Sequence, residues 1–236
     1  MAMDHFQFKQ FTIAQDRCAM KVGTDALLLG AWVNVHDREH ALDIGTGTGI
    51  LSLMMAQRNS NLNVEAIEIE ANAAEQAKGN AANSNWSDRI SVDHIDLNDF
   101  EAEPTFDLIV SNPPYFAKGT VSPNEARSKA RQETSLDLNS LFQKAADLSN
   151  ESALFSLIYP FDQRAALIKA ALGKGWFIKR TTEVLDSPEK TPVRILAEFT
   201  KEIVIPTPAS LIIIRNSDNS YHEDYVALTK EFLTIF

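Results

Sequence analysis

The chain has 236 residues, of which 44% are hydrophobic and 23% are charged, as in an ordinary globular protein with enough apolar residues for one well-buried domain. Cys18 is its only cysteine, which excludes an internal disulfide and a cysteine-based zinc cluster and indicates a reducing, cytoplasmic compartment. The formal net charge of −10 counts against a large nucleic-acid surface, although not against a local one.

The N-terminal part of the chain carries no secretory signal pattern, and no apolar run is long enough to span a membrane. We expect one domain over residues 1–236 with a short N-terminal extension of about 39 residues. Within that extension, residues 25–33 read as a helix that Thr24 would cap.

From residue 40 onward, short apolar strands alternate with helical patterns, which is typical of an α/β fold around a parallel sheet. The expected strands are residues 41–44, 64–67, 90–95, 106–111 and 153–159. The helices expected between them are residues 50–58, 71–83, 136–148 and 163–172.

The pattern changes in the last third of the chain. Residues 177–185 and 194–205 are longer, β-branched alternations with no helix between them, which predicts an antiparallel hairpin at the sheet edge with residues 187–192 as its loop. Residues 211–214 could form a final short strand and residues 222–236 a closing helix.

A glycine-rich turn follows the first strand of the alternating region. In residues 43–49, glycines at alternate positions allow a tight turn and the close approach of a ligand. The spacing matches neither the dinucleotide fingerprint nor a phosphate-binding loop. Asp43, expected at the mouth of the loop, would repel a pyrophosphate but attract an ammonium group. The loop therefore predicts S-adenosylmethionine, which has an amino-acid tail, an adenosine end and no phosphate.

Carboxylates follow the next two strands. Glu68 ends the second strand and could accept hydrogen bonds from both ribose hydroxyls. Asp96 follows the third strand and could accept a hydrogen bond from the adenine amine. Glu70 competes with Glu68, and Asp93 with Asp96, so both choices stay open.

The tetrapeptide Asn112-Pro113-Pro114-Tyr115 follows the fourth strand. Two prolines fix a stiff turn there, because they can neither continue a ladder nor enter a helix interior. The Asn112 side-chain oxygen and the Pro113 carbonyl could accept the two N–H bonds of a planar amine, and Tyr115 could stack on its face. Taken alone, the tetrapeptide could equally be an ordinary turn.

Residues 118–131 form a locally basic segment, in which four cations stand against the single acid Glu125. We interpret this segment as the candidate contact with nucleic acid, the alternative being a solvated loop or helix face. Its cations are Lys118, Arg127, Lys129 and Arg131.

In this order, the glycine loop, Glu68, Asp96 and residues 112–115 resemble the class I S-adenosylmethionine-dependent methyltransferases of the amino, N6-adenine type. Residues 20–32 and the short chain narrow the resemblance to the bacterial enzymes that methylate N6 of adenine 37 in valine tRNA. The resemblance covers about residues 20–180. It implies a Rossmann-like seven-stranded mixed sheet of strand order 3-2-1-4-5-7-6 with helices on both faces.

The resemblance also implies roles for individual residues. Asn112 and Pro113 would hold the target amine and Tyr115 would stack on the flipped base. The implied cofactor ligands are Lys21, Thr24, Asp43, Gly45, Gly47, Glu68, Asp96, Leu97 and Asn112. The implied substrate is tRNA, and we expect no metal, no membrane and no obligate protein partner. Because the chain is acidic, tRNA docking would depend on the basic segment, the N-terminal arm and Lys174, Lys179 and Arg180.

Other activities share the same tetrapeptide. A protein-glutamine N5-methyltransferase of release factors presents it to a side-chain amide, although that family carries a helical N-terminal domain. Guanine-N2 methylation of rRNA, methylation of DNA or of small molecules, and a non-catalytic cofactor-binding module are further alternatives.

Overall fold

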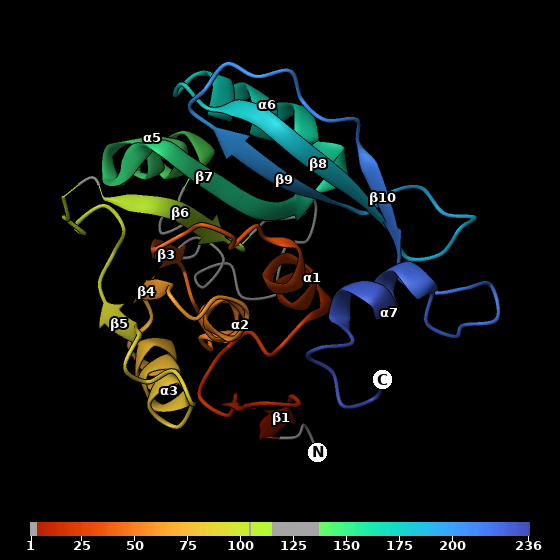
Figure 1. Cartoon of the computed structure of the whole chain (residues 1–236), viewed down its shortest axis with the longest axis horizontal. Helices are drawn as coiled ribbons and strands as arrows, with labels where there is room; N and C mark the ends of the chain where they lie inside the picture. The colour runs from red at the N-terminus through yellow and green to blue at the C-terminus, as the bar shows by residue number, and fades with distance from the viewer. Residues whose placement is uncertain (1–3, 104, 115–136) are drawn as a thin grey trace, which may run out of the picture.

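The computed structural model describes residues 4–103, 105–114 and 137–236, and its central feature is a twisted sheet with helices packed on both faces (Figure 1). The strands are β1 (His5–Gln7), β2 (Thr12–Ala14), β3 (His40–Ile44), β4 (Asn63–Glu68), β5 (Ile90–His94), β6 (Phe106–Ser111), β7 (Ser149–Pro160), β8 (Phe177–Leu185), β9 (Arg194–Thr200) and β10 (Ser210–Ile213). The helices are α1 (Thr24–Trp32), α2 (Ile50–Arg58), α3 (Ala71–Ala82), α5 (Leu138–Leu148), the 3₁₀ helix η1 (Phe161–Gln163), α6 (Arg164–Leu172) and α7 (Glu223–Thr229).

The eight strands of the main sheet run in the order β10-β8-β9-β7-β6-β3-β4-β5. Strands β3 to β7 are parallel, and β9 is antiparallel to both β7 and β8. Seven of these strands have the order 3-2-1-4-5-7-6, which confirms the α/β fold class. The eighth, β10, pairs in parallel with β8, so the predicted hairpin does not form the outermost edge.

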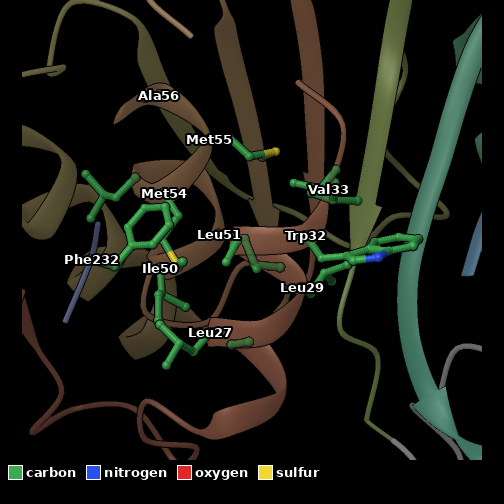
Figure 2. Close-up of a cluster of buried hydrophobic side chains, with 14 of the residues drawn as sticks. Leu27, Leu29, Trp32, Val33, Ile50, Leu51, Met54, Met55, Ala56 and Phe232 are labelled. Carbon is green, nitrogen blue, oxygen red and sulfur yellow. The ribbon is translucent and has the colours of Figure 1, made fainter. Parts of the chain in front are cut away.

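One hydrophobic layer lies between the sheet and helices α1, α2, α3 and α7, and Figure 2 shows the part between α1 and α2. Side chains of α1 and α2 point toward one another, and Phe232 from the C-terminal segment joins them. The two helices approach closely at Gly30, where an added Cβ would lie 2.6 Å from Met54 Sδ. The N-terminal extension is thus part of the core and does not lie outside it.

The opposite face of the sheet is covered by α5 and α6 (Figure 1). Its centre is aromatic: the Phe142 ring meets Phe155 and Phe199 edge-on, at centroid distances of 5.1 and 5.2 Å. The fully buried Trp176 packs against Phe155 and donates from its indole nitrogen to the Phe142 carbonyl at 3.1 Å. Such edge-to-face pairs add to the stabilisation that burial alone provides.

The predicted start of α1 and the predicted end of β9 are wrong, for identifiable reasons. Helix α1 begins at Thr24 with Gly23 as its N-cap, and no side chain caps it, so Thr24 is the first helical residue and not the cap. Strand β9 ends at Thr200 instead of residue 205, because its two partners pair no further than Thr200. The isoleucines beyond this point, Ile203 and Ile205, are exposed.

The first described residues of the chain lie beside its C-terminal segment, which the sequence does not predict (Figure 1). Strands β1 and β2 form a short antiparallel hairpin, and Phe8 of that hairpin bridges to Leu233. The C-terminal segment therefore leaves the helical conformation after Thr229, instead of continuing to residue 236 as predicted. Among the described residues, no helix is both long and apolar enough to cross a membrane.

Candidate active site

The predicted site features meet at one edge of the sheet because neighbouring parallel strands end in register. Ile44 at the end of β3 lies opposite Ile67 of β4 and Ser111 of β6, and Glu68 lies opposite His94 of β5. The segments that follow β5, β4, β3 and β6 therefore leave the sheet side by side. In an open α/β sheet, ligands bind at this carboxyl edge, where the order of strands reverses.

The glycine loop leaves β3 in a conformation that L side chains rarely adopt. Gly45, Gly47 and Gly49 have φ values of 71°, 58° and 81°. A Cβ at Gly49 would lie 3.4 Å from Ala77 of α3, whereas one at Gly45 or Gly47 would meet no atom within 4 Å. The loop backbone thus borders open space that a ligand can approach closely.

Asp43 lies beneath this loop and is fully buried, not at its mouth as predicted. Its Oδ2 accepts hydrogen bonds from Thr46 Oγ1 at 2.6 Å and from Ser52 Oγ at 2.7 Å. Within the described residues, its Oδ1 has no hydrogen-bond partner. Burial raises the pKa of this carboxyl from 3.8 to about 6, although the two hydroxyl donors oppose the shift. A cation that approached Oδ1 would satisfy the unpaired oxygen and restore the charged form.

Glu68 connects the end of β4 to the glycine loop. Its Oε2 accepts from the Gly47 backbone N–H at 2.9 Å, and its Oε1 accepts from that of Glu70 at 3.0 Å. Each carboxylate oxygen can accept a further hydrogen bond. The Glu68 carboxylate therefore borders the open space of the loop, while Glu70 is an exposed residue at the start of α3. Of the two candidates, Glu68 has the geometry of a ligand.

Asp96 lies in the turn after β5, as predicted. Its Oδ1 accepts from Asn98 N and Nδ2 at 2.8 and 2.9 Å, which orients the carboxylate. The adjacent Leu97 is buried in the same hydrophobic cluster as Ile67. Asp93, by contrast, lies inside β5 and is exposed, so the position of Asp96 fits the predicted role better.

The turn after β6 is described as far as Pro114. Asn112 is half-buried, Pro113 buried and Pro114 exposed. Ser111, the last residue of β6, donates from its hydroxyl to the Ile44 carbonyl at 2.9 Å, which ties this turn to the start of the glycine loop. The remaining predicted residues of this region lie outside the described residues, namely Tyr115, Lys118, Arg127, Lys129 and Arg131.

The N-terminal segment from Ala14 to Val22 is held against α3 by side-chain amides that the sequence patterns did not single out. Asn80 accepts from the Ala14 N–H at 2.9 Å and donates to both the Ala14 and Thr48 carbonyls at 3.0 and 2.8 Å. Gln76 binds Asp16 and the Arg17 N–H in the same way. Asn80 thus joins the N-terminal segment to the glycine loop.

This segment also runs beside Glu68. Burial first, and then the Glu68 carboxylate, raise the pKa of the Cys18 thiol, which indicates that the two side chains are near each other. Lys21 and Thr24 are exposed at the end of the segment and the start of α1. Lys21 and Thr24, the predicted cofactor ligands of the N-terminal part, therefore lie at the end of a segment that is bonded to the glycine loop through Asn80.

Arg180, whose contact with tRNA stays a prediction, has a role in the fold. Its guanidinium lies 3.8 Å from the Trp32 ring centroid and forms two hydrogen bonds with the buried Glu198, at 3.0 and 3.1 Å. It also donates to the Trp32 carbonyl at 3.0 Å. This cluster fixes α1 to strands β8 and β9.

Comparisons with known proteins agree with this geometry. Residues 18–134 match the Methyltransferase small domain family. A protein of Phocaeicola vulgatus named tRNA1(Val) (adenine(37)-N6)-methyltransferase is 45% identical over 98% of this chain and 98% of its own length. A protein of the same name from Salmonella enteritidis is 42% identical over 96% of this chain and 94% of its own length.

Solved structures with similar folds are more distant. A predicted O-methyltransferase from Agrobacterium tumefaciens superposes with a TM-score of 0.63 at 20% identity, covering 88% of this chain and 96% of its own. TYW2 from P. horikoshii, in complex with MeSAdo, gives a TM-score of 0.59 at 15% identity, covering 86% of this chain and 74% of its own. At these identities the likeness concerns the fold alone.

Proposed function

The chain belongs to the tRNA1(Val) (adenine(37)-N6)-methyltransferase family, and from that membership we propose that it transfers a methyl group from S-adenosylmethionine to N6 of adenine 37 in valine tRNA. One observation carries the proposal: the turn that begins with Asn112 and the glycine loop leave adjacent strands that pair up to Ile44 and Ser111. The methyl donor and the target amine would therefore meet at the same place on the sheet edge.

Two features support the fit of the cofactor. The unpaired, buried Asp43 Oδ1 offers a partner for the ammonium group of a methionine tail. The open faces of Gly45 and Gly47 leave room for that tail against the backbone. Glu68 would accept from the ribose hydroxyls, and Asp96 with Leu97 would hold the adenine. When bound, S-adenosylmethionine supplies an electrophilic methyl group on its sulfonium.

The proposed catalytic role of the chain is to hold and orient the target base. The lone pair of an exocyclic adenine nitrogen is delocalised into the ring, which makes the nitrogen a poor nucleophile. Asn112 Oδ1 and the Pro113 carbonyl would accept hydrogen bonds from its two N–H groups and draw these hydrogens out of the ring plane, so that the lone pair points toward the methyl group. Alignment of two reactants can lower a barrier by about 7–11 kcal/mol. Tyr115 would stack on the flipped base and offset part of its unstacking cost.

The substrate and the compartment follow from the same family membership. We propose tRNA as the substrate, with the base taken out of its stack to reach the turn. We also propose a cytoplasmic location, where tRNA is modified. The basic residues 118–131 would contribute to docking through phosphate contacts, which are electrostatic and independent of sequence.

A methyl-transfer panel tests this function. The purified chain is given labelled S-adenosylmethionine and, separately, tRNA, rRNA, DNA and a release factor. We expect label in tRNA alone, recovered as N6-methyladenosine. Label in release-factor glutamine or in rRNA guanine would instead identify one of the rival activities, and no label in any substrate would point to a non-catalytic module.

A further inference from the structure

A cavity lies at the same edge of the sheet, beyond β7, and Thr24 alone among its lining residues has a role in the site described above. Its volume is about 830 Å³, within the range of about 300–1,000 Å³ typical of sites for small ligands. Three parts of the chain line it: the start of α1, the loop between β8 and β9, and the segment between β10 and α7. Thr24 of α1 lines this cavity and is also a proposed cofactor ligand, so the two sites adjoin.

A column of three stacked side chains ends in the cavity. Tyr225 is buried, and Tyr221 stacks on it with ring centroids 5.2 Å apart and an interplanar angle of 13°. The Arg215 guanidinium lies over the Tyr221 ring at 4.0 Å. Phe236 packs edge-on against Tyr221 at 5.2 Å, which fixes the column from the side. Half-buried Arg215 is the end of the column and lines the cavity.

Protein contacts fix the position of the Arg215 guanidinium but leave some of its N–H donors for a ligand. Its Nη1 donates to the Asn219 carbonyl at 2.8 Å, and a guanidinium has five N–H donors. Its planar face can stack on a nucleobase, as RNA-binding proteins use arginine. Beside it, Asn216 also lines the cavity and is held by its own donations to Ser220 Oγ and the Tyr221 carbonyl.

Three acids and three cations line the cavity, namely Asp25, Asp186 and Glu189 with Lys190, Arg194 and Arg215. Glu189 accepts a hydrogen bond from Ser217 Oγ. Arg194 forms a half-buried ion pair with Asp25 at 2.9 Å. Lys190 is exposed and only 3.5 Å from Asp186, the kind of surface pair that contributes little energy and is readily exchanged. Lys190 and Arg215 are therefore the cations with which a phosphate group could pair, next to the flat face on which a base could stack.

We propose that this cavity binds a nucleotide flanking adenine 37 in the anticodon arm of the tRNA, with its base on Arg215 and its phosphate at Lys190. This inference rests on the proposed tRNA substrate. Arg194 lies opposite Pro160 on β7, and Leu157 of β7 lies opposite Ser111 on β6. From these registers, the cavity rim is on the order of 15 Å from the end of β6, a span of about four stacked nucleotides.

Binding of a labelled anticodon-arm RNA hairpin, followed by fluorescence anisotropy, tests the site. We expect Arg215→Ala to weaken binding by about tenfold, as loss of a stacked base does. Arg215→Lys should weaken RNA binding by the same factor, because lysine keeps the positive charge but has no planar group on which a base can stack. Lys190→Ala should reduce the slope of log affinity against log salt by about one. The control removes two exposed lysines elsewhere on the molecule, Lys78→Ala with Lys169→Ala, and should bind like the unmodified chain.

A second measurement changes the RNA instead, so its first arm uses only the unmodified chain. Hairpins with one abasic nucleotide, placed in turn at about four positions on either side of adenine 37, are bound to the unmodified chain and to Arg215→Ala. At one position the abasic substitution should weaken binding to the unmodified chain about tenfold. The same substitution should weaken binding to Arg215→Ala little further, because the missing base and the missing guanidinium belong to one contact.

The outcomes separate this site from the proposed function. Unchanged affinity for every abasic hairpin and for Arg215→Ala, with adenine 37 still methylated, would overturn the cavity site alone. The expected losses of binding without methylation of adenine 37 would support the RNA site and overturn the proposed function. An unmodified chain that binds no hairpin would overturn both.

Discussion

Asp43 is the residue whose chemistry changes most between the free protein and the proposed complex. It is buried with one oxygen unpaired, and its pKa is raised to about 6. Because the folded protein holds the proton more tightly than the unfolded chain, ionisation of Asp43 opposes folding. Its contribution to the free energy of unfolding should fall by about 3 kcal/mol between about pH 4 and pH 6 and stay level above.

This pH step can be measured by urea unfolding between pH 4 and pH 7. Asp43→Asn keeps the shape of the side chain and removes the titration. The difference in unfolding free energy between the two proteins should therefore shift in favour of the variant as the pH rises through this window. A difference that stays constant from pH 4 to pH 7 would show that Asp43 titrates normally.

Ionisation of Asp43 should also change the affinity for the cofactor. It lowers the stability of the free protein, but it should strengthen cofactor binding. Only the ionised carboxylate can pair with the ammonium group of the methionine tail, so binding of S-adenosylmethionine should strengthen as the pH rises through about 6. Calorimetric titrations at several pH values would show the rise for the unmodified chain and none for Asp43→Asn. An equal pH dependence in the two proteins would remove Asp43 from the cofactor site.

Asn112 allows a test of the chemical step itself. In Asn112→Ala the target amine loses one of its two acceptors, and turnover should fall by at least about 100-fold, the cost of a misplaced reactant. Binding of S-adenosylmethionine should weaken far less than turnover, because Asn112 is only one of nine implied cofactor ligands. Single-turnover methyl transfer and calorimetry measure the two effects separately, with Asn139→Ala on the exposed side of α5 as the control. Near-normal turnover of Asn112→Ala would contradict the mechanism.

At the scale of elements, the N-terminal segment and α3 hold the glycine loop together through Asn80. Asn80→Ala leaves buried backbone groups of Ala14 and Thr48 unpaired, at a cost of about 1–3 kcal/mol for each such group. We expect the Michaelis constant for S-adenosylmethionine to rise severalfold while turnover at saturation is kept. Asn83→Ala, which removes only an exposed bond to the Gly79 carbonyl, is the matched control. An unchanged Michaelis constant in Asn80→Ala would mean that this contact serves stability alone.

The attachment of α1 to the sheet depends on a buried ion pair. In Arg180→Ala, the nearly inaccessible Glu198 carboxylate would lose both hydrogen bonds from the guanidinium, and breaking such a pair costs about 3–5 kcal/mol. Urea unfolding measures this loss. Arg17→Ala removes an exposed pair with Glu75 and should change stability by less than about 1 kcal/mol. Equal effects of the two substitutions would contradict the structural role of Arg180.

For the whole molecule, the sequence predicts those strands and helices whose apolar residues recur at a regular local spacing. Alternating apolar runs located the central strands and helices, and the strand ends located Glu68, Asp96 and Asn112 at a single edge. Such patterns do not show long-range partners. The Asn80 contacts with Ala14 and Thr48, the Phe8 bridge to Leu233, and the extra strand β10 all join segments far apart in the chain.

Single residues misled prediction where tertiary contacts decide their role. Thr24 has the side chain of a helix cap, yet it is the first residue of α1, and Gly23 is the N-cap. Arg180 reads as a surface cation but lies between Trp32 and Glu198. Asp43 was expected at the loop mouth but is fully buried, and Thr46 and Ser52 donate hydrogen bonds to its carboxylate.

Mapping the methyl group on a defined substrate shows whether this sheet edge methylates one adenine of valine tRNA. The purified chain is incubated with S-adenosylmethionine and an unmodified transcript of valine tRNA, which is then digested and analysed by mass spectrometry. A transcript with guanine in place of adenine 37 is the control. We predict N6-methyladenosine at position 37 of the first transcript and no methyl group on the second. Equal methylation of both transcripts, or of neither, would show that the chain does not methylate adenine 37.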